Sequence, residues 1–115
     1  MKKRVSQRVF SRKTGPRKAL QKSLLRSLVL KEKIETTLAK AKTLSPTAEK
    51  MITKARKGDI ATRRQMTALL GKDGARKLMD EVAPRYKGRS GGYTRIFKLA
   101  PRASDQAKRA VIEFV

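Results

Sequence analysis

Residues 89–99 read Arg-Ser-Gly-Gly-Tyr-Thr-Arg-Ile-Phe-Lys-Leu, and this stretch is the starting point for predicting the fold. Gly91 and Gly92 stand directly before a run of β-favouring residues, which predicts a strand entered through a tight turn. Glycine adopts positive φ readily and lets another backbone come close, and a phosphate backbone is one candidate for that approach. The alternative is a plain turn that leads into a core strand. Three basic side chains accompany the segment: Arg89, Arg95 and Lys98.

Two other stretches have the composition of strands. Residues 110–115, Ala-Val-Ile-Glu-Phe-Val, are almost continuously apolar, which predicts a strand buried on both faces. This strand and the one after Gly92 pair most simply as an antiparallel hairpin with a loop from Pro101 through Asp105. Residues 33–37, Lys-Ile-Glu-Thr-Thr, predict a short third strand, and Thr37 is suited to cap the helix that follows.

The first helix is expected to begin near Pro16, with Thr14 or Gly15 as its cap. Leucines recur at every fourth position and predict the face that joins the core: Leu20, Leu24 and Leu28. Lys18, Lys22 and Arg26 recur with the same spacing, offset by two positions, so they lie on the opposite face.

Three more helices are predicted before the glycine pair. The first follows Thr37 and ends before Gly58, and Pro46 is expected to kink or break it. Its core positions are Ala41, Leu44, Ala48, Met51, Ile52 and Ala55. The second is capped by Asp59 and closed by Gly71, and the third begins near Asp73 and stops at Pro84. The core positions of the third are Ala75, Leu78, Met79 and Val82.

Composition narrows the class of partner. The chain has 115 residues, which favours one domain, and 31 Lys and Arg against 9 Asp and Glu give a formal net charge of +22. Self-repulsion of this size opposes compaction, and a polyanion relieves it by neutralising charge and releasing its own counterions. Nucleic acid is therefore the expected partner, and an anionic membrane surface is the alternative.

Other classes are disfavoured. The chain has no cysteine and no histidine, which removes disulfides, thiolate metal sites and the commonest general base. No apolar run approaches the ~20 residues of a membrane span. We expect a soluble protein of a reducing compartment, without a cofactor, a metal or a small-molecule substrate.

Residues 1–15 form the expected basic arm, and residues 16–115 the single domain. The arm contains few apolar residues, and no acidic residue precedes Glu32, so the arm is expected to order only on a polyanion. Its basic residues are Lys2, Lys3, Arg4, Arg8, Arg12 and Lys13.

The predicted nucleic-acid contacts extend from the arm along the chain. Beyond the arm they are Arg17, Lys18, Lys22, Arg26, Arg85, Lys87, Arg89, Gly91, Gly92, Tyr93, Arg95, Lys98 and Arg102. Tyr93 is included as a ring that could stack on an unpaired base, and the alternative for it is a half-buried strand residue.

The alternatives to RNA binding are a DNA-binding protein and a nuclease. A DNA-binding or nucleoid-associated protein would need a helix-turn-helix, and only the junction from Gly71 to Asp73 offers one. A nuclease would need clustered carboxylates for its metals, whereas the acidic residues here are scattered. The adjacent Asp80 and Glu81 point in different directions on a helix and are interpreted as surface charges.

The chain resembles the bacterial large-subunit ribosomal protein L17 family. The resemblance is carried by residues 33–42 (Lys-Ile-Glu-Thr-Thr-Leu-Ala-Lys-Ala-Lys), residues 48–55 (Ala-Glu-Lys-Met-Ile-Thr-Lys-Ala), residues 89–96 and residues 111–115. The family pattern usually has His where Pro16 stands, and Gly where Ser104 stands.

The resemblance implies a two-layer α+β fold: a helix, a strand, three helices and two strands, with a small mixed sheet packed on the helices and a basic N-terminal arm. It also implies a structural, non-catalytic constituent of the large (50S) ribosomal subunit in the cytoplasm, towards the peptide exit side. The implied partners are 23S rRNA and neighbouring large-subunit ribosomal proteins.

Overall fold

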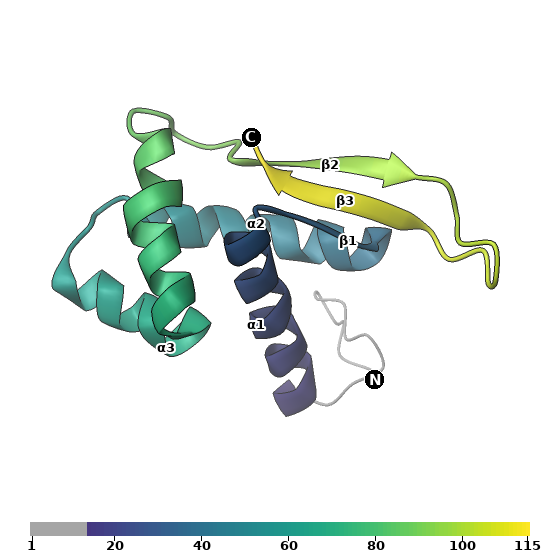
Figure 1. Cartoon of the computed structure of the whole chain (residues 1–115), viewed down its shortest axis with the longest axis horizontal. Coiled ribbons are helices and arrows are strands. Elements are labelled where there is room, and N and C mark those ends of the chain that lie inside the picture. Colours follow the sequence, from purple (N-terminus) through teal and green to yellow (C-terminus); the bar gives the residue numbers. More distant parts are fainter. Residues whose placement is uncertain (1–13) are drawn as a thin grey trace, which may run out of the picture.

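The computed structural model describes residues 14–115 (Figure 1). Of the predicted basic arm, residues 1–15, residues 1–13 lie outside the described residues, whereas Thr14 and Gly15 belong to the first helix, which begins two residues before the expected start at Pro16. The elements in chain order are α1 (Thr14–Lys31), β1 (Lys33–Thr37), α2 (Leu38–Ala55), α3 (Ile60–Lys77), a π-helical turn η1 (Leu78–Val82), a 3-10 turn η2 (Ala83–Tyr86), β2 (Thr94–Leu99) and β3 (Arg109–Phe114). The α+β class and the predicted order of elements are confirmed.

The three strands form one sheet in the order β1-β3-β2, and both pairings are antiparallel. The predicted β2–β3 hairpin is therefore present, but the sheet is not mixed as expected. In β3, Ile112 lies opposite Ile34 of β1 and Ile96 of β2. Because the chain enters β1 and β2 in the same direction and β3 runs between them in the opposite one, no parallel pair arises.

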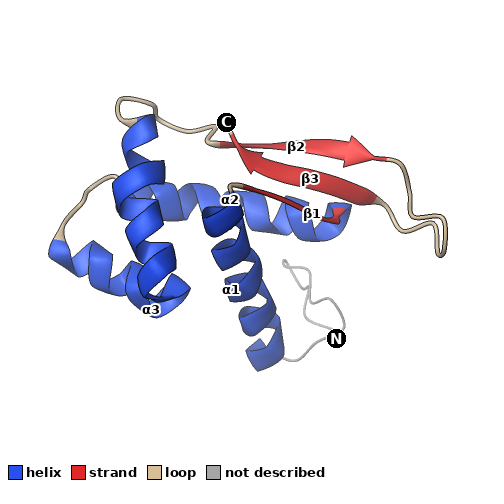
Figure 2. Cartoon of the chain, in the orientation of Figure 1, coloured by secondary structure: helices blue, strands red, loops and turns tan. Residues whose placement is uncertain are grey.

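The strand β3 is buried on one face only, which corrects the expectation of burial on both. Ala110, Ile112 and Phe114 are buried, whereas the residues between them are partly exposed. The helices cover a single side of the sheet, so the alternating side chains of β3 divide between core and surface (Figure 2).

Helix α1 joins the core through a stripe slightly displaced from the predicted one. Leu25, Leu28 and Val29 are fully buried, while Leu24 packs against the core from a partly exposed position. The four-residue spacing of the leucines predicted the correct side of the helix. The centre of its contact lies between the leucine row and Val29, because α3 packs across the later turns of α1.

Helix α2 lies beneath the sheet and buries all six predicted core positions. The Thr37 hydroxyl accepts a hydrogen bond from the Lys40 amide at 3.3 Å, which confirms the predicted cap. Pro46 was expected to kink or break this helix, and the helix continues through it without a break. Pro46 and Lys42 are both exposed, and solvent can hydrate the Lys42 carbonyl that proline leaves without a helical donor.

Helix α3 bends at Gly71, where φ is 79° and ψ is 172°, and so consists of the two predicted helical segments. Asp59 caps the first segment by accepting from the Thr62 amide at 2.7 Å, and hydrogen bonding to the side chain of Thr62, followed by that to its amide, lowers the pKa of Asp59. The second segment continues through η1 and past Pro84, which was expected to stop it. Pro84 stands in the first turn of η2, where its missing N–H costs no helical bond.

A buried aromatic pair joins the end of the helical layer to the sheet. The rings of Tyr86 and Tyr93 lie 5.0 Å apart at 56°, and the Tyr86 hydroxyl donates to the Val115 carbonyl at 2.8 Å. Burial raises the pKa of Tyr86.

No helix within residues 14–115 has the length and apolar character to cross a membrane.

Candidate nucleic-acid interface

The outer side of α1 carries the first group of predicted contacts. Lys18 and Lys22 are exposed and Arg17 is partly exposed. Within residues 14–115, none of the three side chains forms an ion pair or a hydrogen bond. All three charges are therefore available to an external anion.

Arg26, predicted as a fourth member of this row, is engaged within the chain instead. Its guanidinium donates to the carbonyl of Leu70, directly before the bend at Gly71. A Cβ placed on Gly71 would lie 2.7 Å from Nη1 of Arg26. Arg26 thus satisfies a carbonyl that the bend of α3 leaves open, and it links α1 to α3.

The glycine pair sits in a loop whose conformation is fixed from both sides. Gly92 has φ 67°, and an added Cβ there would meet only Nη2 of Arg89, at 3.7 Å. At Gly91 an added Cβ would have no atom of the chain within 4 Å. Arg89 donates to the Gly91 carbonyl at 3.2 Å. The surface beside Gly91 is therefore open to the approach of another molecule.

A groove runs between this loop and α2. It has a volume of about 480 Å³ and is lined by Pro46, Glu49, Lys50, Thr53, Lys54, Ser90, Gly91 and Tyr93. Lys50 and Lys54 lie one turn apart on α2, are exposed, and form no ion pair or hydrogen bond with any described residue. Glu49 is occupied, because one of its carboxylate oxygens accepts from the Tyr93 amide at 3.0 Å. The two free ammonium groups and the open glycine backbone give the groove the chemistry of a phosphate-binding surface.

Besides Arg26, four of the predicted arginines are bound to groups of the chain. Arg85 pairs with Glu32, Arg95 with Glu113 at 2.7 Å, and Arg102 with Asp105 at 3.1 Å. The fourth is Arg89, through its bond to the loop. In contrast, Lys87 and Lys98 are exposed and form no such bond within residues 14–115.

The structure contradicts the proposed stacking role of Tyr93. Its side chain is 1% exposed, its hydroxyl donates to the Arg89 carbonyl at 2.9 Å, and it accepts from Arg56 at 2.7 Å. The ring therefore belongs to the core and offers no face to a base. The sequence could not reveal this, because Arg56 and Glu49, which fix Tyr93, come from a distant helix.

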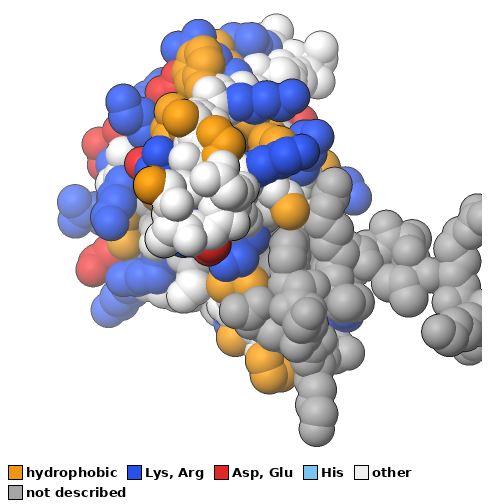
Figure 3. Space-filling model, turned by 90° about the vertical axis from the view of Figure 1, so that its right-hand side faces the viewer, with side chains coloured by type: hydrophobic (Ala, Val, Ile, Leu, Met, Phe, Trp, Pro, Cys, Tyr) orange, Lys and Arg blue, Asp and Glu red, His pale blue; other side chains and the backbone are white. Residues whose placement is uncertain are grey.

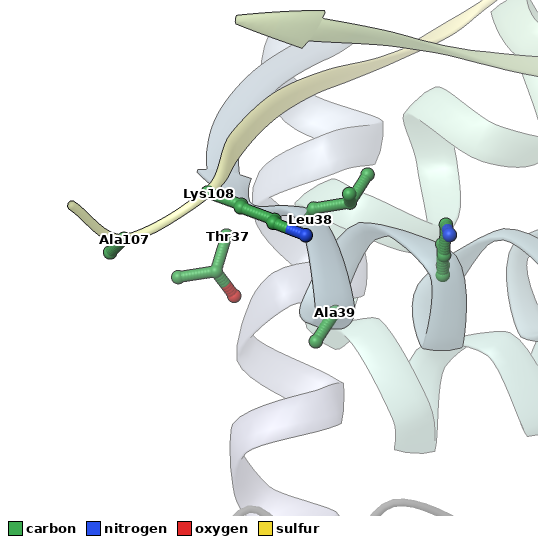
Figure 4. A pocket seen from close by; sticks show the side chains of 6 residues that line it. Thr37, Leu38, Ala39, Ala107 and Lys108 are labelled. Atoms are coloured by element: carbon green, nitrogen blue, oxygen red, sulfur yellow. The ribbon is translucent and has the colours of Figure 1, made fainter. Parts of the chain in front are cut away.

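A second depression, of about 390 Å³, lies where the β2–β3 loop meets the start of α2 (Figure 4). Lys42 and Lys108 contribute to its lining, and Figure 4 shows Lys108 beside Leu38. The Leu38 amide donates to the Lys108 carbonyl at 3.0 Å, and the Lys40 amide is used by Thr37. The N-terminal amides of α2 are thus largely satisfied, and we assign no separate anion site here.

The β2–β3 loop is closed by its own polar contacts. Asp105 accepts from the Ala107 amide at 3.1 Å and pairs with Arg102, and these contacts lower the pKa of Asp105. Gln106 adopts φ 57°, so a left-handed residue completes the turn although no glycine is present.

Most carboxylates already bind groups of the chain itself, and the excess of Lys and Arg side chains has no carboxylates to neutralise it. Seven of the nine acidic side chains take part in ion pairs or accept hydrogen bonds: Glu32, Glu35, Glu49, Asp59, Asp80, Asp105 and Glu113. The side of the molecule that carries the β2–β3 loop shows many Lys and Arg side chains and few carboxylates (Figure 3). No three Asp or Glu side chains within residues 14–115 lie close enough together to hold a metal ion.

The junction at Gly71 does not present a recognition helix. Gly74, Ala75, Leu78, Met79 and Val82 of the following segment are buried. A helix that reads DNA needs exposed side chains directed into the major groove, and this one uses its face for the core.

Several basic residues of the surface were not predicted as contacts. Lys50 and Lys54 are the most relevant, because they lie across the groove from Gly91. Their spacing of four residues, opposite the core stripe of α2, is visible in the sequence. The sequence does not show that this helix face borders the glycine loop.

Comparison with known proteins identifies the family. The profile of the family described as ribosomal protein L17 matches residues 20–115. Among similar proteins, the large ribosomal subunit protein bL17 of a Hydrogenobaculum species is 52% identical over 117 residues, covering 100% of this chain and 99% of that protein. The bL17 proteins of Shouchella clausii and Caldanaerobacter subterraneus are each 47% identical, covering 92% and 96% of this chain and 96% and 100% of their own lengths. The chain therefore belongs to the ribosomal protein L17 family.

Proposed function

We propose that the chain is a structural constituent of the large ribosomal subunit that binds and neutralises folded 23S rRNA. Its other partners in this proposal are neighbouring proteins of the same subunit. Phosphates contact the outer side of α1 through Arg17, Lys18 and Lys22, and the groove beside Gly91 through Lys50 and Lys54.

The observation that supports this proposal best is the set of unpaired cations around the groove. A surface lysine is usually solvated, and on its own it says little about a ligand. Here the lysines face an open glycine backbone in a chain of net charge +22. Binding a polyanion there would release its condensed counterions, and this release drives association.

The experiment is sedimentation of cell lysate followed by a high-salt wash. We expect the chain to sediment with the large subunit and to remain there after the wash. A variant carrying Lys50→Gln and Lys54→Gln should be released at lower salt than one carrying Arg64→Gln and Lys72→Gln. The control pair removes the same charge from exposed positions of α3. Absence of the wild-type chain from the large subunit would refute the proposal.

The position towards the peptide exit side rests on the family resemblance. A nucleoid-associated role is the competing function, and purified components separate the two. We expect folded 23S rRNA to displace the chain from duplex DNA at physiological salt. Equal affinity for the two would favour a general polyanion binder.

A further inference from the structure

The side of the sheet turned away from the helices differs in character from the rest of the surface. We call it the outer sheet face. Across the strands it has three rows: Lys33, Glu113 and Arg95; Glu35, Val111 and Phe97; Thr37, Arg109 and Leu99. All nine residues are exposed or partly exposed, whereas Ala110, Ile112 and Phe114 point into the core.

The centre of this face is apolar. Phe97 is 48% exposed and lies directly opposite Val111, and Leu99 is 36% exposed two positions further along β2. Only four large apolar side chains are strongly exposed within residues 14–115, and two of them are therefore next to each other here. β2 is an edge strand, so this apolar cluster borders the rim of the sheet.

The charges around the cluster are largely neutralised within the chain. Arg95 pairs with Glu113 at 2.7 Å, and Arg109 pairs with Glu35 at 2.9 Å. The guanidinium of Arg95 also lies 5.1 Å from the centre of the Phe97 ring. Three cations and two carboxylates leave this face close to neutral, although the chain carries +22.

These features determine which partner the face suits. A phosphate backbone would meet Glu35 and Glu113 beside the apolar cluster, and both carboxylates repel it. A second copy of the chain would bring another +22 into contact, so self-association is disfavoured. An apolar cluster bordered by satisfied ion pairs has the anatomy of a protein–protein contact.

We propose that the outer sheet face docks a neighbouring protein of the large subunit, whose apolar side chains cover Phe97 and Leu99. This inference rests on the proposed function, because it places the chain in the same particle. It divides the molecule by partner: α1 and the groove beside Gly91 bind RNA, and the outer sheet face binds protein.

Photo-crosslinking within purified large subunits tests the division. The variant Phe97→p-benzoylphenylalanine should crosslink to a protein of the subunit, whereas Lys22→p-benzoylphenylalanine should crosslink to 23S rRNA. Crosslinks from position 97 to rRNA, to a second copy or to nothing would overturn the docking proposal. Absence of both variants and of the wild-type chain from the subunit would instead refute the proposed function.

A second measurement uses the absence of cysteine from the chain. The variant Leu99→Cys introduces a single thiol at an exposed position. We expect maleimide to label it in the free protein and to label it at least tenfold more slowly in the assembled subunit. Equal labelling rates in the two states would show that the face is open to solvent and would overturn the proposal.

Discussion

At the scale of single residues, Arg56 shows how one side chain fixes the loop beside the proposed binding groove. Its guanidinium donates to the Arg89 carbonyl and to the Tyr93 hydroxyl, and it lies 5.9 Å from the centre of the Tyr93 ring. Glu49 holds the Tyr93 amide. The open backbone at Gly91 is thus presented by a loop that is already ordered before any partner arrives.

Gly92 is a residue of this loop whose backbone conformation disfavours a side chain. Its φ of 67° lies in the left-handed region, where a side chain costs ~1–2 kcal/mol and a β-branched one costs more. We expect Gly92→Val to lower the melting temperature and to weaken RNA binding. Ser90→Val is the matched control for the melting temperature alone, since Ser90 is an exposed neighbour without positive φ but lines the groove. Gly88 is no control, because its φ of 85° imposes the same restriction. Identical melting curves for the Gly92 and Ser90 variants would contradict the expected strain.

Glu32 connects the end of α1 to α3 and η2. It pairs with Arg85 and with Lys77, the latter at 3.3 Å, and the bond from Arg85 contributes most to lowering the pKa of Glu32 below its ordinary value of 4.5. A carboxyl whose folded pKa is depressed stabilises the protein above its unfolded pKa. That contribution is lost as the pH falls through the folded pKa.

We therefore expect Glu32→Gln to destabilise the protein at neutral pH, and the difference from wild type to shrink as the pH falls below 4.5 and to vanish once it is below the lowered pKa of the folded state. The side chain is 36% exposed, so screening limits the effect to about 0.5–1 kcal/mol. Glu81→Gln is the control, because Glu81 forms no ion pair among the described residues. Urea unfolding at several pH values measures both, and a difference that persists at low pH would refute this account.

At the scale of elements, the local signals in the sequence were reliable. The caps Thr37 and Asp59, the end of a helical segment at Gly71 and the whole core stripe of α2 were predicted, because each depends on residues of a single element. The errors concern the prolines. Pro46, expected to kink or break α2, does not break it, and Pro84 does not end the helical chain, because both stand where the missing N–H is tolerated.

The contact between α1 and α3 could not be predicted, and the bond from Arg26 to the Leu70 carbonyl is one of its links. We expect Arg26→Met, which keeps the aliphatic stem, to destabilise the protein by about 1–2 kcal/mol, since the Leu70 carbonyl loses its charged donor. Lys22→Met removes an equal charge from the same helix without breaking a bond. Thermal unfolding of the two variants makes the comparison, and equal melting temperatures would mean that Arg26 is a surface charge like its neighbours.

At the scale of the whole molecule, the sequence predicted the class of partner better than the contacting residues. The net charge and the glycine loop are visible in the sequence. The positions of the carboxylates in the folded structure decide which Lys and Arg side chains stay unpaired. A local sequence pattern does not predict these positions. Arg26, Arg85 and Arg95 are bound by groups far away in the sequence and Arg102 by Asp105 in its own loop, whereas Lys50 and Lys54 gain importance from the loop opposite them.

Salt dependence measures the number of cations that contact phosphate. The logarithm of RNA affinity should fall with the logarithm of salt concentration by roughly 0.7–0.9 per phosphate neutralised. We expect the variant with Lys50→Gln and Lys54→Gln to lose roughly twice this amount from the slope. The control with Arg64→Gln and Lys72→Gln should keep the wild-type slope. A flat dependence for the wild-type chain would contradict electrostatic binding altogether.

The register of the sheet also constrains the order in which the chain folds during synthesis. β1 follows the first helix, but its hydrogen-bonding partner is β3, which pairs Glu113 with Lys33. The helices can form early from contacts close in sequence, whereas the sheet must wait until β3 has been translated. A nascent chain interrupted before Arg109 would contain β1 and β2 without β3, the strand that lies between them. Helix α2 would then lack its contacts with β3. Such a chain would expose two unpaired strand edges and an apolar helix face, the features that chaperones and proteases recognise in incomplete products.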